Sequence, residues 1–247
     1  MDFFIVIKVG CCGFQRNRKE YYKIFKVVEI QETFYNIPAT KRMKELRKEA
    51  PADFEFTVKC FQGVTHPPSS PTWKRSKIKV DESSKYGNLQ PSKEVFDSWE
   101  KTLEICKILD SKICLIQLPA SFRDSHENIN NAEQFFSSIN KNEINIAIEL
   151  RGWSEENIKT LCEKFDLIHC VDLFAGKPLY LSTKEILYTR LHGSPPGKKM
   201  YSYKFTLNDL NILKENVDKI YAKQKYILFN NIYMFEDAKE FQKIIMK

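Results

Sequence analysis

Eight short apolar runs, rich in β-branched and aromatic residues, recur along the chain and constrain its fold more than any other feature. Each run has the length and composition of a β-strand, and most consecutive runs are separated by a stretch with helical spacing of apolar residues. Strands that alternate with helices pair in parallel through right-handed crossovers, and eight such strands close a barrel. The sequence therefore predicts an α/β fold, a (β/α)₈ barrel of the TIM type, with residues 1–247 as a single domain.

The boundaries follow from the same pattern. The predicted strands span residues 3–9, 27–31, 54–60, 113–118, 144–150, 167–172, 186–191 and 226–230. The predicted helices span residues 17–25, 39–50, 95–109, 133–139, 155–165, 207–223 and 238–246.

Two of the connections between strands have a short predicted helix or none, which leaves an open, doubly wound sheet as the alternative topology. The first helix is short, and residues 174–184 contain Gly and Pro and predict a loop. Two long loops, at about 63–91 and 193–206, follow the third and seventh strands. Loops of this length are usually functional, and barrel active sites are built at the carboxyl ends of the strands.

The amino-acid composition indicates which class of ligand and which cellular compartment to expect. The chain has 39 Lys and Arg against 32 Asp and Glu, a net charge of +7, which suits an anionic ligand; a solvated lysine-rich surface is the alternative explanation. The seven cysteines include no CxxC pair and several lie in apolar runs, so we expect free thiols in a reducing compartment. No apolar run approaches membrane length. We therefore expect a cytoplasmic protein without membrane contact, and the oligomeric state stays open.

Six short motifs lie in a fixed order at the predicted strand ends. They are E-x-x-x-TFY at 29–35, K-x-x-x-x-x-TH at 59–66, QLP at 117–119, E-x-R-x-W at 149–153, RLHG at 190–193 and FNN at 229–231. Together they resemble the domain-of-unknown-function 72 family, the YecE-like proteins, over nearly the whole chain. The resemblance implies a TIM barrel related to sugar isomerases and endonuclease IV-like proteins.

The chain departs from that family at two places. The family's tryptophan-bearing segment after the first strand is replaced by the shortened CCGFQRNRKEYY at 11–22. Gly152 stands where the family commonly has a histidine. No role of that tryptophan or histidine can be transferred to this chain.

Alternation of side chains along each strand predicts which polar residues face the barrel interior. It places Glu29 with Gln31, Thr33 and Tyr35 on one face, Glu149 with Arg151, and Arg190 with His192. The predicted inward set at the mouth is Glu29, Lys59, Gln117, Glu149, Arg151, Arg190 and His192. Two carboxylates among fixed cations favour an active site with shifted pKa values; an ion-pair network that only fixes the packing is the alternative.

Chemical roles follow from residue type. His192 is the expected acid–base group, with Glu149 or Glu29 as the base, because imidazole titrates near neutral pH. Arg151 and Arg190 are the expected clamps on substrate charge. The remaining predicted substrate-binding residues are Lys59, His66, Gln117, Tyr35, Trp153, Asn230 and Asn231.

Metal binding and function complete the predictions. A divalent metal site could be formed by Glu29, Glu149, Asp172 and His192. Because positively charged side chains lie among these ligands and would repel a metal ion, we expect neither a metal nor a cofactor. We expect an enzyme that applies acid–base chemistry to a small anionic or phosphorylated substrate, by isomerisation or hydrolysis. The alternatives are an endonuclease IV-like phosphodiester hydrolase, whose nucleic-acid binding we expect to be weak and salt-sensitive, and a non-catalytic binding barrel.

Overall fold

The computed structural model describes residues 5–141, 143–193 and 200–246. The strands are β1 (Val6–Cys11), β2 (Val27–Ile30), β3 (Glu55–Lys59), β4 (Ile113–Gln117), β5 (Asn145–Glu149), β6 (Ile168–His169), β7 (Ile186–Leu191) and β8 (Gln224–Phe229). The helices in the described residues are α1 (Arg18–Ile24), α2 (Glu32–Tyr35), α3 (Thr40–Glu49), α4 (Gln62–Thr65), the 3₁₀ turn η1 (Pro71–Arg75), α5 (Lys93–Ile108), α6 (His126–Ser138), α7 (Glu155–Phe165), α8 (Leu207–Asp218) and α9 (Met234–Ile245).

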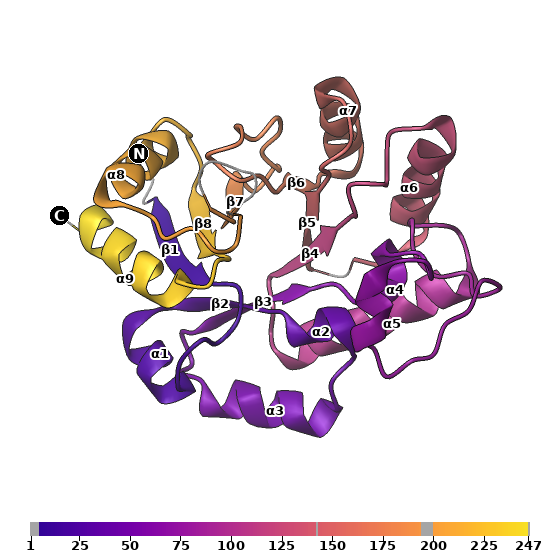
Figure 1. Cartoon of the computed structure of the whole chain (residues 1–247), viewed down its shortest axis with the longest axis horizontal. Helices are drawn as coiled ribbons and strands as arrows, with labels where there is room; N and C mark the ends of the chain where they lie inside the picture. Colours follow the sequence, from indigo (N-terminus) through magenta and orange to yellow (C-terminus); the bar gives the residue numbers. More distant parts are fainter. Residues whose placement is uncertain (1–4, 142, 194–199, 247) are drawn as a thin grey trace. The chain divides into compact units, whose positions relative to one another are not determined.

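Hydrogen bonds connect the strands in their sequence order. The sheet order is β6-β5-β4-β3-β2-β1-β8-β7, and an isolated parallel bridge between Val171 and Thr189 links the segment after β6 to β7. Consecutive strands are therefore neighbours all the way round, which is the topology of a (β/α)₈ barrel. Figure 1 shows the alternation of strands and helices along the chain. As predicted, residues 174–184 between β6 and β7 form no helix.

Residue contacts divide the chain into two compact units, which we describe separately. Unit 1 comprises Met1–Glu29, Pro51–Glu55 and Ile168–Lys247, and unit 2 comprises Ile30–Ala50 and Phe56–Leu167. The prediction of one domain over residues 1–247 stays a prediction. Within residues 5–141, 143–193 and 200–246, every helix lacks the length or the apolarity that a bilayer crossing requires.

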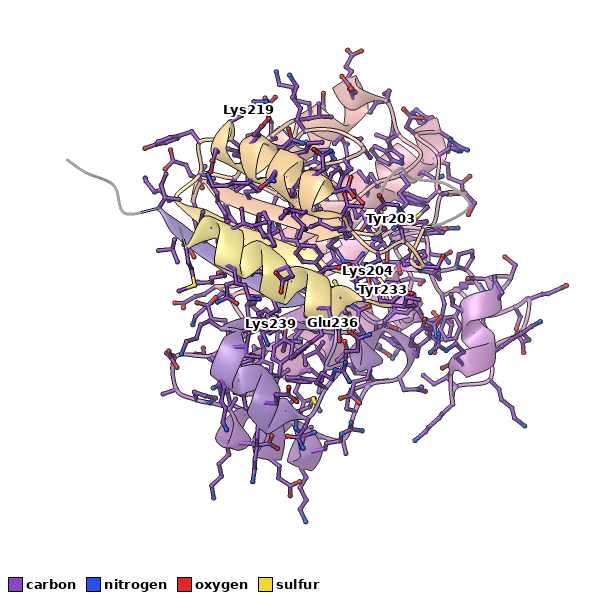
Figure 2. All side chains as sticks on the ribbon, turned by 60° about the vertical axis from the view of Figure 1, so that its left-hand side comes forward. Tyr203, Lys204, Lys219, Tyr233, Glu236 and Lys239 are labelled. Atoms are coloured by element: carbon purple, nitrogen blue, oxygen red, sulfur yellow. The ribbon has the colours of Figure 1, made fainter. Side chains whose placement is uncertain are left out.

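In unit 1, β1 pairs in parallel with β8 along its whole length, from Val6 opposite Gln224 to Cys11 opposite Phe229. This pairing explains why β1 begins and ends later than the predicted 3–9, of which residues 3 and 4 lie outside the described part. Helix α9 packs against β1 and α8 packs against α9 (Figure 1). Charged side chains point to solvent on α9 and directly after α8, as Lys239 and Lys219 show in Figure 2.

Aromatic rings fill the core of each unit. In unit 1, Tyr21 contacts Phe25 at 4.8 Å between ring centroids, and its hydroxyl donates to the carbonyl of Val27. In unit 2, the fully buried Trp99 of α5 meets Phe135 of α6 edge-on at 6.0 Å. The parallel strands β3, β4 and β5 of unit 2 are almost fully buried, as expected of strands covered on both faces.

The alternation predicted beyond β2 is wrong. The strand ends at Ile30, and Glu32–Tyr35 forms the short helix α2, so Gln31, Thr33 and Tyr35 do not continue the face of Glu29. The cause is local: the Thr33 hydroxyl is within hydrogen-bonding distance of the carbonyls of Ile30 (3.0 Å) and Lys59 (2.6 Å) and holds the turned backbone.

The two predicted long loops have different outcomes. The segment at about 63–91 is less irregular than predicted, because it contains most of α4 and all of η1. Trp73 of η1 is buried, and its indole N–H lies 3.0–3.1 Å from the carbonyls of His66 and Pro67. In the loop at 193–206, residues 194–199 lie outside the described part, and the described remainder forms no helix or strand before α8.

Candidate functional site

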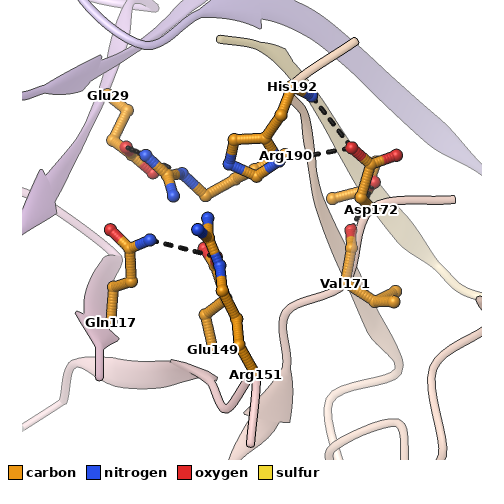
Figure 3. A network of polar contacts seen from close by, with 9 residues as sticks. Glu29, Gln117, Glu149, Arg151, Val171, Asp172, Arg190 and His192 are labelled. Atoms are coloured by element: carbon orange, nitrogen blue, oxygen red, sulfur yellow. Dashed lines mark hydrogen bonds and ion pairs between the residues drawn. The ribbon is translucent and has the colours of Figure 1, made fainter. Parts of the chain in front are cut away.

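Unit 1 contains a buried ion pair between Glu29 of β2 and Arg190 of β7. Glu29 is 0% exposed and Arg190 is 1% exposed. The Arg190 Nε and Nη2 atoms both lie 3.1 Å from Glu29 Oε1, and the Tyr188 hydroxyl donates to Glu29 Oε2 at 2.6 Å. Because a guanidinium and a phenol hold its two oxygens, the Glu29 carboxylate is fixed in one orientation. Figure 3 shows Arg190 beside this carboxylate. Glu29 has the environment of a structural partner more than that of a base waiting for a proton.

Cys12 lies beside this pair. It follows β1 directly, and both Glu29 and Arg190 act electrostatically on its thiol. Burial raises the pKa of Cys12 well above its usual value, and the carboxylate of Glu29 adds to the rise while Arg190 opposes it. All seven cysteines are buried with free thiols. Cys12 is therefore a neutral, poorly nucleophilic thiol.

Two residues after Arg190, at the end of β7, His192 pairs with Asp172. The imidazole Nδ1 lies 3.2 Å from Asp172 Oδ2, and the backbone N–H of His192 donates to the same oxygen at 2.9 Å. The other oxygen, Oδ1, accepts from the backbone N–H of Phe174 at 3.0 Å. A carboxylate at Nδ1 selects the tautomer that carries its proton there, which leaves Nε2 as the basic nitrogen. Figure 3 shows this dyad.

The ring of Tyr201 packs edge-on against the His192 imidazole. The ring centroids are 5.4 Å apart at an angle of 88°, and the Tyr201 N–H donates to the His192 carbonyl at 2.6 Å. Tyr201 has a left-handed backbone, with φ of 69°, and its residue is 41% exposed. The dyad is thus held on one side by the turn at Asp172 and on the other by an aromatic ring that reaches solvent.

Unit 2 contains a second charged group, at the ends of β4 and β5. Gln117 and Glu149 are register partners, and Gln117 Nε2 donates to Glu149 Oε1 at 3.1 Å. The same oxygen accepts from Arg151, whose Nε lies 2.6 Å and whose Nη2 lies 2.5 Å away. The Arg151 side chain is 33% exposed, whereas the Glu149 side chain is 7% exposed. This arrangement presents a cation to solvent over a nearly buried carboxylate (Figure 3).

Lys59 and His66, also in unit 2, lie on the ring of Phe34. Lys59 Nζ is 4.1 Å from the ring centroid, and the imidazole meets the ring edge-on at 4.9 Å. Burial, with a smaller contribution from the Lys59 charge, lowers the pKa of His66 to about 4. His66 Nδ1 is hydrogen-bonded to the Thr65 hydroxyl at 2.7 Å. His66 is therefore a neutral imidazole at physiological pH.

Tyr35 lies at the edge of a polar hollow of about 320 Å³, lined by Gln31, Glu32, Tyr35, Asn36 and Arg75. The Arg75 guanidinium stacks 3.9 Å from the Tyr35 ring centroid, and its Nη1 donates to the Tyr35 hydroxyl at 2.7 Å. The predicted stacking residue Tyr35 is thus paired with an arginine that the sequence interpretation did not select.

The last three predicted site residues make packing and backbone contacts. Trp153 is buried, donates its indole N–H to the carbonyl of Phe122 at 3.0 Å and stacks on that ring. The backbone N–H of Asn230 donates to the carbonyl of Leu191. The buried side chain of Asn231 donates from Nδ2 to the carbonyl of Tyr203 and to Asp237 Oδ2, both at 2.7 Å.

The structure thus brings the predicted residues together within each unit. Glu29 meets Arg190 in unit 1, Gln117 and Arg151 meet Glu149 in unit 2, and His66 shares the Phe34 ring with Lys59. The prediction that all these residues lie at one barrel mouth concerns both units and stays a prediction. Among the described residues, no three His, Cys, Asp or Glu side chains are grouped as metal ligands.

The sequence interpretation missed two partners for which it held a signal. Asp172 was considered only as a metal ligand, although it ends the predicted sixth strand. Tyr188 lies on the same face of β7 as Arg190 and His192, so alternation places all three together. Arg75 had no such signal, because its position depends on the fold of the segment around η1.

Comparison with known proteins identifies relatives of the same fold. A model of the family described as "Protein of unknown function DUF72" matches residues 12–246. A DUF72 family protein from Enterococcus faecalis has 19% identity and a TM-score of 0.73, covering 98% of this chain and 96% of that one. A DUF72 family protein from Thermotoga maritima has 21% identity and a TM-score of 0.69, covering 98% and 100%.

A further structure, described as a D-tagatose 3-epimerase-like protein, has 16% identity and a TM-score of 0.58, covering 97% of this chain and 96% of that one. The search of curated proteins gave no match. With eight parallel strands in sequence order, the prediction of a TIM-barrel α/β fold is confirmed. The match to the family model over nearly all of the sequence establishes that the chain belongs to the DUF72 family.

Proposed function

We propose that the chain is an enzyme that moves a proton at a carbon atom next to a carbonyl group of a small polar substrate, a ketose or ketose phosphate. The observation that carries the proposal is the Asp172–His192 dyad at the end of β7. A histidine with a carboxylate at Nδ1 keeps Nε2 as its basic nitrogen in a fixed orientation, which is what general acid–base catalysis requires.

The reaction has two balanced halves. His192 Nε2 takes a proton from the carbon atom next to the carbonyl, leaving an enediolate, and the resulting imidazolium returns a proton to that carbon or to its neighbour. Asp172 is a positioning residue, because it fixes the ring and stabilises the imidazolium without touching substrate. Return to the neighbouring carbon, with the hydroxyl proton there passing to the former carbonyl oxygen, gives isomerisation. Because one base acts on one face, return to the same carbon restores the substrate but still exchanges its hydrogen with solvent.

Arg190 contributes positive charge behind the dyad. It precedes His192 by two residues. Its guanidinium is fixed by Glu29, which in turn accepts a hydrogen bond from Tyr188. A fixed cation near a developing oxyanion stabilises the transition state more effectively than water does, because it needs no reorganisation. Since Arg190 is only 1% exposed, we assign it this electrostatic role in place of the predicted direct clamp.

Two similarities support the choice of substrate class. The motif resemblance leads to TIM barrels related to sugar isomerases, and one structural neighbour is described as D-tagatose 3-epimerase-like. The roles predicted for Glu149 and Arg151 of unit 2, a base and a charge clamp, stay predictions. Hydrolysis of a phosphate ester is the second candidate, since the same dyad could activate water.

Solvent deuterium exchange tests the proposal without knowledge of the product. The protein is incubated in D₂O with D-tagatose, D-fructose or D-fructose 6-phosphate, and loss of the C–H signal next to the carbonyl is followed by proton NMR. Bis(p-nitrophenyl) phosphate tests hydrolysis in parallel. We expect exchange with at least one ketose and a loss of 10²-fold or more in His192→Asn, the usual size of a general acid–base contribution.

The matched control is His126→Asn, because His126 lies exposed at the start of α6. Asp172→Asn should reduce exchange and shift its pH profile, since the ring loses its carboxylate partner. Exchange that survives His192→Asn, or an absence of exchange with every ketose, would contradict the proposal.

A further inference from the structure

Most of the chain's net positive charge is concentrated on one surface of unit 2. We call it the basic surface and define it as α2, α3 and residues 71–80. Its exposed cations on α3 are Lys41, Arg42, Lys44 and Lys48, and those at 71–80 are Lys74, Arg75, Lys77 and Lys79. Against these eight stand two exposed glutamates of α3, Glu45 and Glu49, so the exposed side chains of the surface carry an excess of six positive charges in a chain whose total is +7.

Polar contacts join the parts of the basic surface. Asn36, which follows α2, donates from Nδ2 to the carbonyl of Arg75 at 3.1 Å and accepts at Oδ1 from the backbone N–H of Lys77 at 2.6 Å. On the other side, Arg42 of α3 lies 2.7 Å from Glu32 of α2. The lysines at 74–79 and those on α3 therefore flank the same short helix.

Two hollows shape this surface. The first, of about 320 Å³, has the Tyr35–Arg75 stack on its wall together with the amide of Asn36. The second, of about 330 Å³, follows one face of α3 and is lined by Thr40, Lys41, Lys44, Glu45 and Lys48. Lys41, Lys44 and Lys48 have the spacing that places side chains on one face of a helix.

From these features we infer that the basic surface binds single-stranded nucleic acid, with a base stacked at the Tyr35–Arg75 pair and phosphates beside the lysines of α3. Single strands are bound where aromatic or arginine planes for stacking lie in a positively charged groove. The Asn36 amide, beside the stack, can hydrogen-bond to a base edge. Because Arg75 is exposed, a base can stack on its guanidinium without entering the core.

A single strand fits better than a duplex or a membrane. A duplex offers its bases only edge-on, so the stacking pair would have no role. An anionic membrane would engage the lysines equally but leave the polar hollow at Asn36 without a partner. This inference is independent of the proposed sugar chemistry, because it uses none of the residues of the dyad.

Fluorescence anisotropy with labelled dT₁₂, rU₁₂ and a 12-base-pair duplex, over 50–300 mM KCl, tests the inference. We expect both single strands to bind more tightly than the duplex. Arg75→Ala should weaken single-strand binding about tenfold, within the range known for one stacked base. The double variant Lys41→Ala/Lys44→Ala should reduce the slope of log affinity against log salt by roughly 1.4, for two lost phosphate contacts.

The matched control is Lys219→Ala/Lys239→Ala, which removes two exposed lysines of unit 1 (Figure 2) and should leave the salt slope unchanged. Circular dichroism confirms folding of each variant. The inference is overturned if wild-type protein shows no binding of dT₁₂ or rU₁₂ at 50 mM KCl, or if the control double variant loses as much affinity. Tighter binding of the duplex overturns it too. Phosphatidylserine vesicles are the last arm: binding to vesicles but not to oligonucleotides, lost in Lys41→Ala/Lys44→Ala, would assign the surface to a membrane instead.

Discussion

Neutralising one partner of the buried Glu29–Arg190 pair should destabilise the protein strongly. In Glu29→Gln the amide oxygen can still accept from Tyr188, but the Arg190 guanidinium keeps its charge in an environment that is 1% exposed. Leaving a buried charge without its counter-charge costs about 3–5 kcal/mol. For a chain of this size, about 2–4 °C of melting temperature is lost per kcal/mol, so the expected decrease is about 6–20 °C.

A double-mutant cycle with urea unfolding separates this effect from a simple loss of packing. Glu29→Gln/Arg190→Met removes both charges and should recover at least about 2 kcal/mol relative to the sum of the single variants, because no charge stays stranded. The control is Glu240→Gln in the exposed Glu240–Lys243 pair, which should cost less than about 0.5 kcal/mol. If Glu29→Gln costs less than about 1 kcal/mol, or if the double variant shows simple additivity, the pair is not the buried electrostatic unit that we describe.

Three further predictions concern the thiols, His66 and Glu149. Since all seven cysteines are buried, none should react with 5,5′-dithiobis(2-nitrobenzoic acid) in the native protein, whereas seven should react in guanidinium chloride; a thiol that reacts natively would contradict this. The pKa of His66, measured by NMR, should be about 4. Between pH 4 and 6.5 the unfolded chain then binds more protons at this histidine than the folded chain does. The free energy of unfolding should therefore fall by up to about 3 kcal/mol as the pH falls through that window. His66→Gln should abolish that part of the pH dependence. Glu149→Gln should cost only about 1 kcal/mol in urea unfolding, because Arg151 is one-third exposed and is rehydrated; a cost near that of Glu29→Gln would show a buried network instead.

The sequence predicted those parts of the fold that local patterns determine. Helix α7 and strand β7 have the predicted boundaries, since Ser154 caps the helix and β7 is a fully buried run rich in apolar residues. The end of β2 was not predictable, because it depends on a hydrogen bond from Thr33 to the carbonyl of Lys59, which is remote in sequence. Helix α6 begins seven residues earlier than predicted for a local reason: its first two turns, from His126, are mostly polar and contain only Ile129 and Ala132 as apolar residues.

The candidate site shows the same division. Alternation along β7 was sufficient to place Arg190 and His192 on one face, because strand geometry alone fixes that relation. It could not show that Glu29 holds Arg190, because Glu29 lies 161 residues earlier, on β2. Asp172 carried a signal, since it ends the predicted sixth strand, but alternation within one strand does not identify a partner on the next. Arg75 is the clearest case, since only the folded segment around Asn36 brings it onto Tyr35.

The connection between β6 and β7 has a consequence for how the Asp172–His192 dyad can be disrupted. Asp172 follows a strand of only two residues, and the segment after it has no covering helix. It is held by a few individual contacts, among them the Leu179 N–H on His169 Nδ1 and the Asn216 amide on the Leu173 carbonyl. Segments with so few backbone ladder bonds open at a lower free energy than the whole protein unfolds. Partial opening of this segment would release the carboxylate from His192 while the rest of the β-sheet stays intact, so heat or mild denaturant should abolish the proposed activity before the protein melts.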